Sequence, residues 1–169
     1  MPVENEYKYV LRDSRRLRSA LGANGVSLRQ AYLSAHNRIR SVEGADGAVD
    51  RWFTFKMMTS EGLVEIENAI SETDFDRLWP LSGNRLSKTR FSFDLDGHWD
   101  VDLFGDLHAP YFVMAEVELP EGTPEPPIAD FLAPDLIAAV GKDPAFSSHR
   151  LSDEQYARQL LATLERARA

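Results

Sequence analysis

The sequence predicts a mainly β domain of the α+β class, in which eight antiparallel strands close into a barrel with a few flanking helices. Eight segments are rich in β-branched and aromatic residues, and clusters of Gly, Asn, Asp and Ser separate them. Charged residues recur at alternate positions within these segments, as in strands with one polar face. The chain has 169 residues, of which 43% are hydrophobic, and this size predicts a single domain over residues 1–169.

The predicted strands follow one another through short turns. Asp-Gly and Gly-Asp pairs, which favour tight hairpin turns, separate the last three. The eight segments are residues 3–11, 28–33, 37–42, 52–57, 63–70, 86–95, 98–104 and 111–119. An eight-stranded barrel has an interior just wide enough for side chains or one small ligand, so its inner face is the expected place for a site.

Helices are predicted between and after the strands. Asp13 is expected to cap a short basic helix that ends at Gly22, and residues 73–81 form a short helix interrupted at Pro80. Five prolines make residues 120–134 an extended loop, and residues 135–140 are expected to form a helical turn. A capping box at residues 152–155 begins an amphipathic terminal helix over 152–167.

The charge of the chain is acidic overall but unevenly distributed. Lys and Arg number 19 against 27 Asp and Glu, a net charge of -8, which argues against a duplex nucleic-acid or membrane-surface partner. Residues 1–40 nevertheless hold eight basic and three acidic residues, whereas residues 91–141 hold eleven acids and neither Lys nor Arg. If these segments meet in space, opposite charges can form a site that the total hides.

Several kinds of chemistry are excluded by composition. The chain has no cysteine, so thiolate metal sites, disulfides and cysteine nucleophiles are excluded, and its four histidines form no zinc motif. The first residues lack the apolar core of a signal peptide, and no apolar run approaches the ~20 residues needed to cross a bilayer. We therefore expect a cytoplasmic protein.

Charged residues two positions apart lie on one face of nearly every predicted strand. A solvated face explains any single strand best, but such a face tends to mix its signs, whereas five of these pairs are wholly acidic or wholly basic. Carboxylate clusters suit a hard divalent cation, and Arg/Lys clusters suit phosphate oxygens. The charged sets are Glu4, Glu6 and Lys8; Arg38 and Arg40; Glu65 and Glu67; Lys88 and Arg90; Asp100 and Asp102; and Glu116 and Glu118; Lys56 lies mid-strand with Thr54 on its face.

These residues resemble the CYTH superfamily, the triphosphate tunnel metalloenzymes. Glu4-Asn-Glu6-Tyr-Lys8 matches the N-terminal ExExK signature, and the other segments follow in family order over roughly residues 3–119. They are LRQAYL at 28–33, Arg38-Ile-Arg40, Phe-Thr-Phe-Lys56, Glu65-Ile-Glu67, Lys88-Thr-Arg90, Trp99-Asp-Val-Asp102 and Ala-Glu116-Val-Glu118-Leu. The resemblance implies an eight-stranded antiparallel tunnel that hydrolyses, or in some members cyclises, a triphosphate with Mg2+ or Mn2+.

The resemblance also implies a role for each charged residue. Metal ligands would be Glu4, Glu6, Glu116 and Glu118, with Asp102 an additional one. The phosphate chain would be held by Lys8, Arg38, Arg40, Lys56, Lys88 and Arg90, while Glu65, Glu67 and Asp100 line the tunnel in weaker roles. Catalysis would rest on Glu4, Glu6 and Lys56, and Lys56 is either a general base or a plain phosphate ligand.

The C-terminal third departs from the family pattern. Members usually carry a Glu-Val-Thr segment and then a basic-Tyr-x-Asn pattern, whereas this chain has Ala139-Val140-Gly141 and Ala145-Phe146-Ser147-Ser148. Lys142, His149 or Arg150 are candidates to replace the lost contacts. The departure bears on the choice of substrate more than on metal binding.

Three functions are therefore weighed. The first is a metal-dependent hydrolase of inorganic triphosphate or a related organic triphosphate, such as a nucleoside or thiamine triphosphate. The alternatives are a class IV-type adenylate cyclase, and a module that binds polyphosphate or nucleotide without turnover. The four clustered glutamates count against the binding module, since an anion binder gains nothing from them. Either a monomer or a homodimer is compatible with the sequence.

Overall fold

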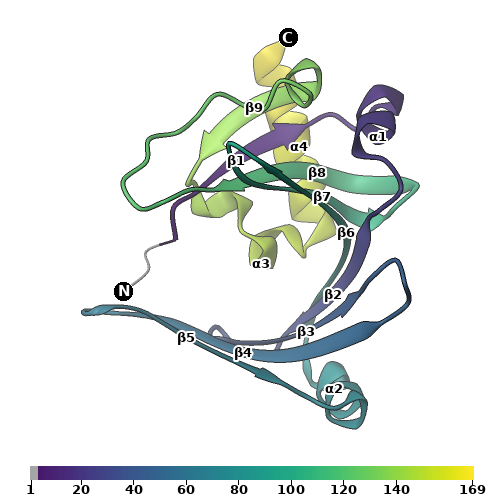
Figure 1. The fold of residues 1–169 in the computed structure, drawn as a ribbon, viewed down its shortest axis with the longest axis vertical. Helices are drawn as coiled ribbons and strands as arrows, with labels where there is room; N and C mark the ends of the chain where they lie inside the picture. The colour runs from purple at the N-terminus through teal and green to yellow at the C-terminus, as the bar shows by residue number, and fades with distance from the viewer. Residues whose placement is uncertain (1–3) are drawn as a thin grey trace.

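A computed structural model describes residues 4–169, and its main element is one antiparallel sheet of nine strands (Figure 1). The strands follow the order β5-β4-β3-β2-β6-β7-β8-β1-β9. Their bounds are β1 Glu6–Leu11, β2 Val26–Tyr32, β3 Asn37–Glu43, β4 Val49–Thr59, β5 Gly62–Ala69, β6 Asn84–Leu95, β7 Gly97–Asp106, β8 Ala109–Glu118 and β9 Leu136–Gly141. Each of the eight predicted strands is present; Val3, where the first was expected to begin, lies outside the described residues.

The expected closed barrel of eight strands is wrong in strand number and in closure. Within residues 4–169, β5 and β9 form the two edges of the sheet and do not pair with each other. The sheet instead curls, so that an arm made of β3, β4 and β5 faces an arm made of β8, β1 and β9 across an open side (Figure 1). We call the concave surface of this curl the inner face.

The ninth strand is the element that the sequence analysis missed. Residues 135–140 were expected to form a helical turn, but Leu136–Gly141 pairs antiparallel with β1, with Tyr9 opposite Ala139. The pattern of a short apolar run with two alanines is compatible with a helix and with a strand. This run forms a strand because it pairs with the edge of β1 that would otherwise be unpaired.

The helices have the expected positions, with two different caps. Ser14 caps α1 (Arg15–Leu21) by accepting from the Leu17 amide, whereas the predicted cap Asp13 binds Arg18. Asp153 caps α4 (Glu154–Arg168), so the predicted start at Ser152 is one residue early. In both cases a neighbouring Ser or Asp offers the same acceptor oxygen, and sequence alone does not separate them.

The remaining elements are short. Helix α2 (Glu72–Leu78) continues into the 3-10 turn η1 (Trp79–Leu81), where Pro80 was expected to interrupt it. Residues 120–132 form the predicted loop, which ends at η2 (Ala133–Asp135). Two further turns, η3 (Pro144–Phe146) and α3 (Ser148–Leu151), lead into α4.

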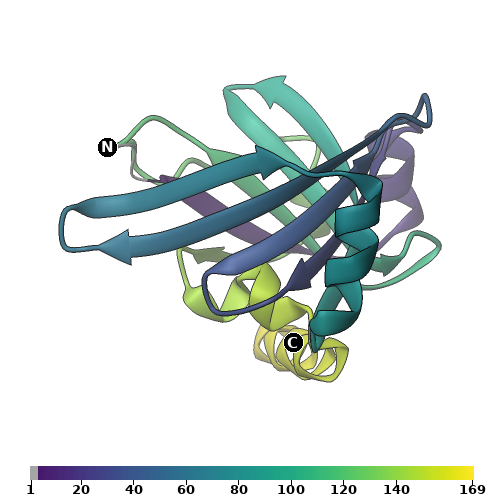
Figure 2. The same ribbon diagram turned by 90° about the horizontal axis from the view of Figure 1, so that it is seen from below.

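Three apolar clusters hold these elements on the sheet. Two lie on its outer face: Tyr9, Trp99 and Leu103 pack with Leu17 of α1, and Ile39 and its neighbours pack with Phe75 of α2. Figure 2 shows α2 as the teal helix against the sheet. The third lies on the inner face, where strand residues contact the C-terminal helices; it includes Val10, Leu86, Phe104, Phe112, Met114, Phe146, Leu151 and Ala157. The C-terminal helices therefore fill one end of the inner face with apolar side chains.

Within residues 4–169, the helices are all too short or too polar to cross a bilayer.

Candidate active site

The charged residues singled out in the sequence converge on the inner face. Contacts across the curl show this directly: Lys56 of β4 forms an ion pair with Glu4, which precedes β1 on the opposite arm. On β1, Lys8 lies 4.0 Å from Glu116 of β8, its partner in the strand ladder. Alternation along the strands then places the rest of each charged set on the same side, opposite the residues that pack on α1 and α2.

The most buried charges form a cluster on β6 and β7. Asp102 accepts hydrogen bonds at both carboxylate oxygens, from Lys88 Nζ (2.6 Å), Arg90 Nε (2.7 Å) and Arg90 Nη2 (2.8 Å). The side chains of Lys88 and Asp102 are 2% and 1% exposed. A buried charge is tolerated only when it is paired and hydrogen-bonded, and this cluster meets that condition.

This cluster continues toward solvent through Asp100. Arg90 Nη1 lies 3.1 Å from Asp100 Oδ2, and Asp100 Oδ1 accepts from the Ser92 hydroxyl at 2.5 Å. His98 lies between Asp100 and the exposed Asp94, with ring nitrogens 3.2 and 2.8 Å from the two carboxylates. The β6–β7 part of the inner face is therefore neutralised by its own residues.

The hydrogen bonds set the protonation states of the cluster. Burial alone would raise the pKa of Asp102, but the charges and hydrogen bonds of Lys88 and Arg90 lower it to about 2. Burial also opposes the charge of Arg90, yet the hydrogen bonds and charge of Asp102 raise its pKa above the usual value. Asp102 and Arg90 are thus a carboxylate and a guanidinium at all ordinary pH values.

The arm that contains β3, by contrast, carries arginines whose donors are only partly satisfied. Arg38 and Arg40 of β3 each have a buried Nε that makes no hydrogen bond within the described residues. Arg40 lies 3.8 Å from Glu67, whose Oε2 instead accepts from the buried Thr54 hydroxyl at 2.9 Å. Burial, and then repulsion from Arg38, lower the pKa of Arg40. Unsatisfied buried donors are costly, and an anion on the inner face would satisfy them.

A cavity lies beside these arginines at the turn between β2 and β3. Its volume is about 170 Å3, and its lining includes Tyr32, Arg38, Thr54 and Lys56 together with the turn residues 34–37. The cationic side chains of Arg38 and Lys56 therefore border an open space on the inner face.

A wall of carboxylates faces this arm from β1 and β8. Glu6 lies directly opposite Glu118 in the β1–β8 ladder, and like charges in that position repel. Burial, followed by repulsion from Glu116 and Glu4, raises the pKa of Glu6 to about 6. Such a wall is short of positive charge, and a divalent cation would supply it.

The carboxylates do not yet surround one point in this structure. Within residues 4–169, no group of three or more acidic or histidine side chains is arranged to hold a metal ion. Glu4 is held by Lys56, and Glu116 lies near Lys8. The oxygen-only donor set suits Mg2+ or Mn2+ in its chemistry, but a cation would have to draw Glu4 away from Lys56.

The C-terminal candidates for replacing the family's lost contacts are spread apart. Lys142 donates to Asn5 Oδ1 at 2.6 Å and lies over the Tyr7 ring, so it belongs to the outer side of β1. The His149 ring packs edge-on against Tyr32, with the ring centroids 4.8 Å apart. Of the three candidates, His149 is therefore the one whose contact with an inner-face residue is seen; Arg150 is exposed and lines a surface pocket beside it.

Neutral polar residues of the inner face escaped the sequence analysis. Gln30 is buried, and its side-chain amide donates to the Tyr32 hydroxyl at 3.1 Å. Both share a face with Leu28 in β2, which pairs with Lys88 of β6. Gln30 and Tyr32 are two positions apart in β2, so strand alternation predicts that they share a face, but neutral side chains give no charge pattern.

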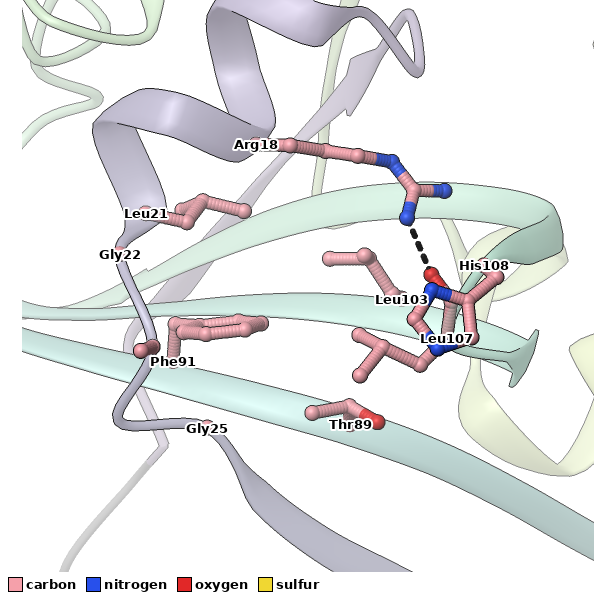
Figure 3. A pocket seen from close by; sticks show the side chains of 10 residues that line it. Arg18, Leu21, Gly22, Gly25, Thr89, Phe91, Leu103, Leu107 and His108 are labelled. Carbon is pink, nitrogen blue, oxygen red and sulfur yellow. Dashed lines mark hydrogen bonds between the residues drawn. The ribbon is translucent and has the colours of Figure 1, made fainter.

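Another cavity, of about 230 Å3, lies on the outer face between α1 and strands β6 and β7 (Figure 3). Leu21, Phe91 and Leu103 line it, and Arg18 at its rim is held by Asp13 and the Leu107 carbonyl. An apolar lining with its one arginine already paired does not suit a polyanion.

Comparisons with known proteins support a relationship over most of the chain. No protein-family model matches it. It is 29% identical over 142 residues to the inorganic triphosphatase of Nitrosomonas europaea (strain ATCC 19718), covering 82% of this chain and 85% of that protein. A crystal structure of the hypothetical protein NE1496 superposes with a TM-score of 0.57 at 25% identity, covering 89% of this chain and 97% of the other. The crystal structure of the inorganic triphosphatase NE1496 has the same fold, with a TM-score of 0.58 at 24% identity over 90% and 95% of the two chains. The chain is thus similar to an inorganic triphosphatase over most of its length, in agreement with the resemblance of its charged motifs to the CYTH superfamily.

Proposed function

We propose that this protein is a divalent-metal-dependent triphosphatase that hydrolyses inorganic triphosphate or a related organic triphosphate on the inner face of its sheet. The observation that carries the proposal is the opposition of two unbalanced walls. Arg38 and Arg40 have buried donors without partners, while Glu6 has a raised pKa in a cluster of carboxylates. A complex of a triphosphate with a divalent cation brings the charge that each wall lacks.

The cationic wall suits a chain of phosphates. A triphosphate carries about four or five negative charges and must be desolvated, so it needs several cations together with metal. Arg38, Arg40 and Lys56 lie on β3 and β4, Lys8 lies on β1 of the opposite arm, and Arg90 lies on β6 between the two arms. Arginine is well suited to this task because its planar fork binds phosphate oxygens in pairs.

The carboxylate wall suits the metal. Glu4, Glu6, Glu116 and Glu118 would hold Mg2+ or Mn2+, both of which prefer oxygen ligands. When bound, the cation neutralises phosphate charge and activates water for attack. Asp102 is less suited, because both its oxygens are occupied by Lys88 and Arg90.

The protein's own side chains would position the phosphate chain and stabilise its charge. Phosphoryl transfer needs little covalent help, so catalysis rests on holding the chain in line and stabilising its charge. Lys56 would exchange Glu4 for a phosphate oxygen once Glu4 turns to the metal. This exchange makes a phosphate-binding role for Lys56 simpler than a role as general base.

The proposed substrate class follows from the similarity to a protein named inorganic triphosphatase. Tripolyphosphate is therefore the first compound to test, with ATP and thiamine triphosphate as organic alternatives. The protein would be incubated with each compound in Mg2+, in Mn2+ or in chelator, and the products identified by chromatography. We expect metal-dependent release of inorganic phosphate. Cyclic nucleotide from ATP would indicate a cyclase, and binding without any product would indicate a binding module; either result would overturn the proposal.

A further inference from the structure

Lys88 lies in the middle of β6 but does not face open space. Its Nζ donates to Asp102 at 2.6 Å, lies 3.4 Å from the Ser148 hydroxyl of α3, and is 5.3 Å from the centre of the Phe104 ring. These groups leave its side chain 2% exposed. Lys88 is therefore covered from the inner face and is not placed to touch a phosphate.

Asp102 is equally occupied. A carboxylate offers about four lone-pair directions, and three of them receive hydrogen bonds from Lys88 and Arg90. Its side chain is 1% exposed. A metal ion could reach it only by breaking a buried ion pair, which is strongly unfavourable.

Arg90 is the member of this cluster that reaches the inner face. Its side chain is 23% exposed, and it uses Nε and Nη2 on Asp102 and Nη1 on Asp100. A guanidinium has five N–H donors, so two remain for a ligand. The two negative charges of Asp102 and Asp100 balance the two positive charges of Arg90 and Lys88, so the cluster as a whole has no net charge.

We propose that Asp102 is a positioning residue: with Lys88 as its buried counter-charge, it fixes the Arg90 guanidinium for phosphate binding and itself touches neither phosphate nor metal. The phosphate part of this inference rests on the proposed function, whereas the fixing of Arg90 does not. A fixed arginine loses less conformational entropy on binding than a mobile one, so Asp102 contributes to affinity from a distance.

The first test needs no ligand, and it uses one variant only to assign a resonance. In NMR spectra of the 15N-labelled protein, the Arg90 Nε–H group should give a resolved signal that exchanges slowly with water, because it is held between β6 and β7. A signal averaged with those of the exposed arginines would overturn the fixing of Arg90. Arg90→Met identifies the resonance.

The second test separates positioning from metal ligation by calorimetry. For Asp102→Asn we expect the Kd for Mn2+, measured without phosphate, to stay within about 2-fold of wild type. Its Kd for tripolyphosphate in chelator should rise about 10-fold, since hydrogen bonds to charged groups contribute about 1.5 kcal/mol or more. Loss of Mn2+ binding would make Asp102 a metal ligand and overturn the proposal.

A double variant tests whether Asp102 acts through Arg90. Arg90→Met should also weaken tripolyphosphate binding by about 10-fold or more, and adding Asp102→Asn to it should change the Kd by less than about 2-fold, because coupled residues are not additive. Additive losses would overturn the proposal. If wild type binds no tripolyphosphate, the proposed function fails while the NMR result still decides the fixing of Arg90.

Asp135 provides a matched control for the loss of a buried carboxylate. It is 7% exposed, accepts from Ser14 at 2.6 Å and from Arg16 Nε at 2.8 Å, and lies at η2 on the outer side near α1. Asp135→Asn should lower the melting temperature without changing the tripolyphosphate Kd. If Asp102→Asn behaves in the same way, its role is structural only. Asp102→Glu keeps the charge and replaces Asp102→Asn in these titrations if that variant does not fold.

Discussion

Two regions of the inner face, the middle strands β6 and β7 and the arm that contains β3, treat their charges differently. On β6 and β7, Lys88, Arg90, Asp100 and Asp102 neutralise one another through short hydrogen bonds. On β3, Arg38 and Arg40 hold buried donors that nothing in residues 4–169 satisfies. The charges of β6 and β7 are thus held in place before any ligand arrives, whereas the arginines of β3 keep donors free for one. Arg90 combines both properties, since Asp102 and Asp100 hold it and two of its N–H donors remain for a ligand.

Removing carboxylates from β1 or β8 should have the largest effect. Glu6→Gln and Glu116→Gln are each expected to reduce metal-dependent triphosphate hydrolysis by about 100-fold or more. The reason is that a catalytic metal stabilises the charge of the transition state by several kcal/mol. Steady-state rates with Mn2+ measure this, and circular dichroism confirms the fold. Unchanged turnover in both variants would remove the metal assignment.

Truncation should affect the arginines of these two regions differently: Arg40 mainly in ligand binding, and Arg90 in stability as well as in binding. Arg40→Ala is expected to weaken tripolyphosphate binding by about 10-fold or more with little loss of stability, since its Nε makes no hydrogen bond within residues 4–169 and its contact with Glu67 is a long 3.8 Å. Arg90→Ala should lower the free energy of unfolding by about 1.5–3 kcal/mol, because it breaks charged hydrogen bonds to Asp102. Calorimetry and urea denaturation measure the two effects. An unaltered Kd for Arg40→Ala would contradict a phosphate-facing Arg40.

The pH dependence of stability tests the carboxylate wall. The folded protein holds a proton on Glu6 more tightly than the unfolded chain, since its pKa rises from 4.5 to about 6. Stability should therefore fall as the pH rises through this window, by about 1 kcal/mol, which is less than the full shift implies because solvent screens a half-buried group. Urea denaturation between pH 4.5 and pH 7 should show this fall in wild type but not in Glu6→Gln. A similar fall in both proteins would assign it to other groups.

The smallest effect is expected at the solvent end of the charge cluster on β6 and β7. His98 bridges Asp94 and Asp100 but is 46% exposed, and exposed ion pairs contribute little. His98→Gln should change the free energy of unfolding by less than about 0.5 kcal/mol. Hydrogen bonding to Asp94 raises the pKa of His98, so any contribution is present at low pH and is lost as the pH rises through that pKa. A loss above 1 kcal/mol would show that the stability of the β6–β7 cluster depends on its exposed end.

Much of the fold followed from strand alternation and turn residues, and the exceptions have physical causes. Residues 136–141 are too short and apolar for their pattern to separate helix from strand, and pairing with β1 settles the choice. Closure of the barrel depends on how two distant edges meet, which no local pattern encodes. The neighbouring residues Asp13 and Ser14 offered equivalent caps, and tertiary contacts with Arg18 and Leu17 assign them.

The sequence predicted on which face of the sheet each charged residue lies, but not which residue it pairs with. Alternation placed Lys88, Arg90 and Asp102 on the inner face, as the structure has them. It did not show that Asp102 would be enclosed by two cations, since that depends on which residues lie opposite in the β6–β7 register. Gln30 and Tyr32 were missed because neutral polar residues give no charge pattern, although they share that face.

Hydrolysis is expected to need the cationic wall and a metal on the carboxylate wall at once, and a titration with the metal tests this most directly. The initial rate of phosphate release from tripolyphosphate would be followed while Mn2+ is added to protein that has been freed of metal by chelator. We predict no detectable release without the cation and a saturable rise as it is added. An equal rate in chelator, or none at saturating Mn2+, would contradict a metal-dependent triphosphatase.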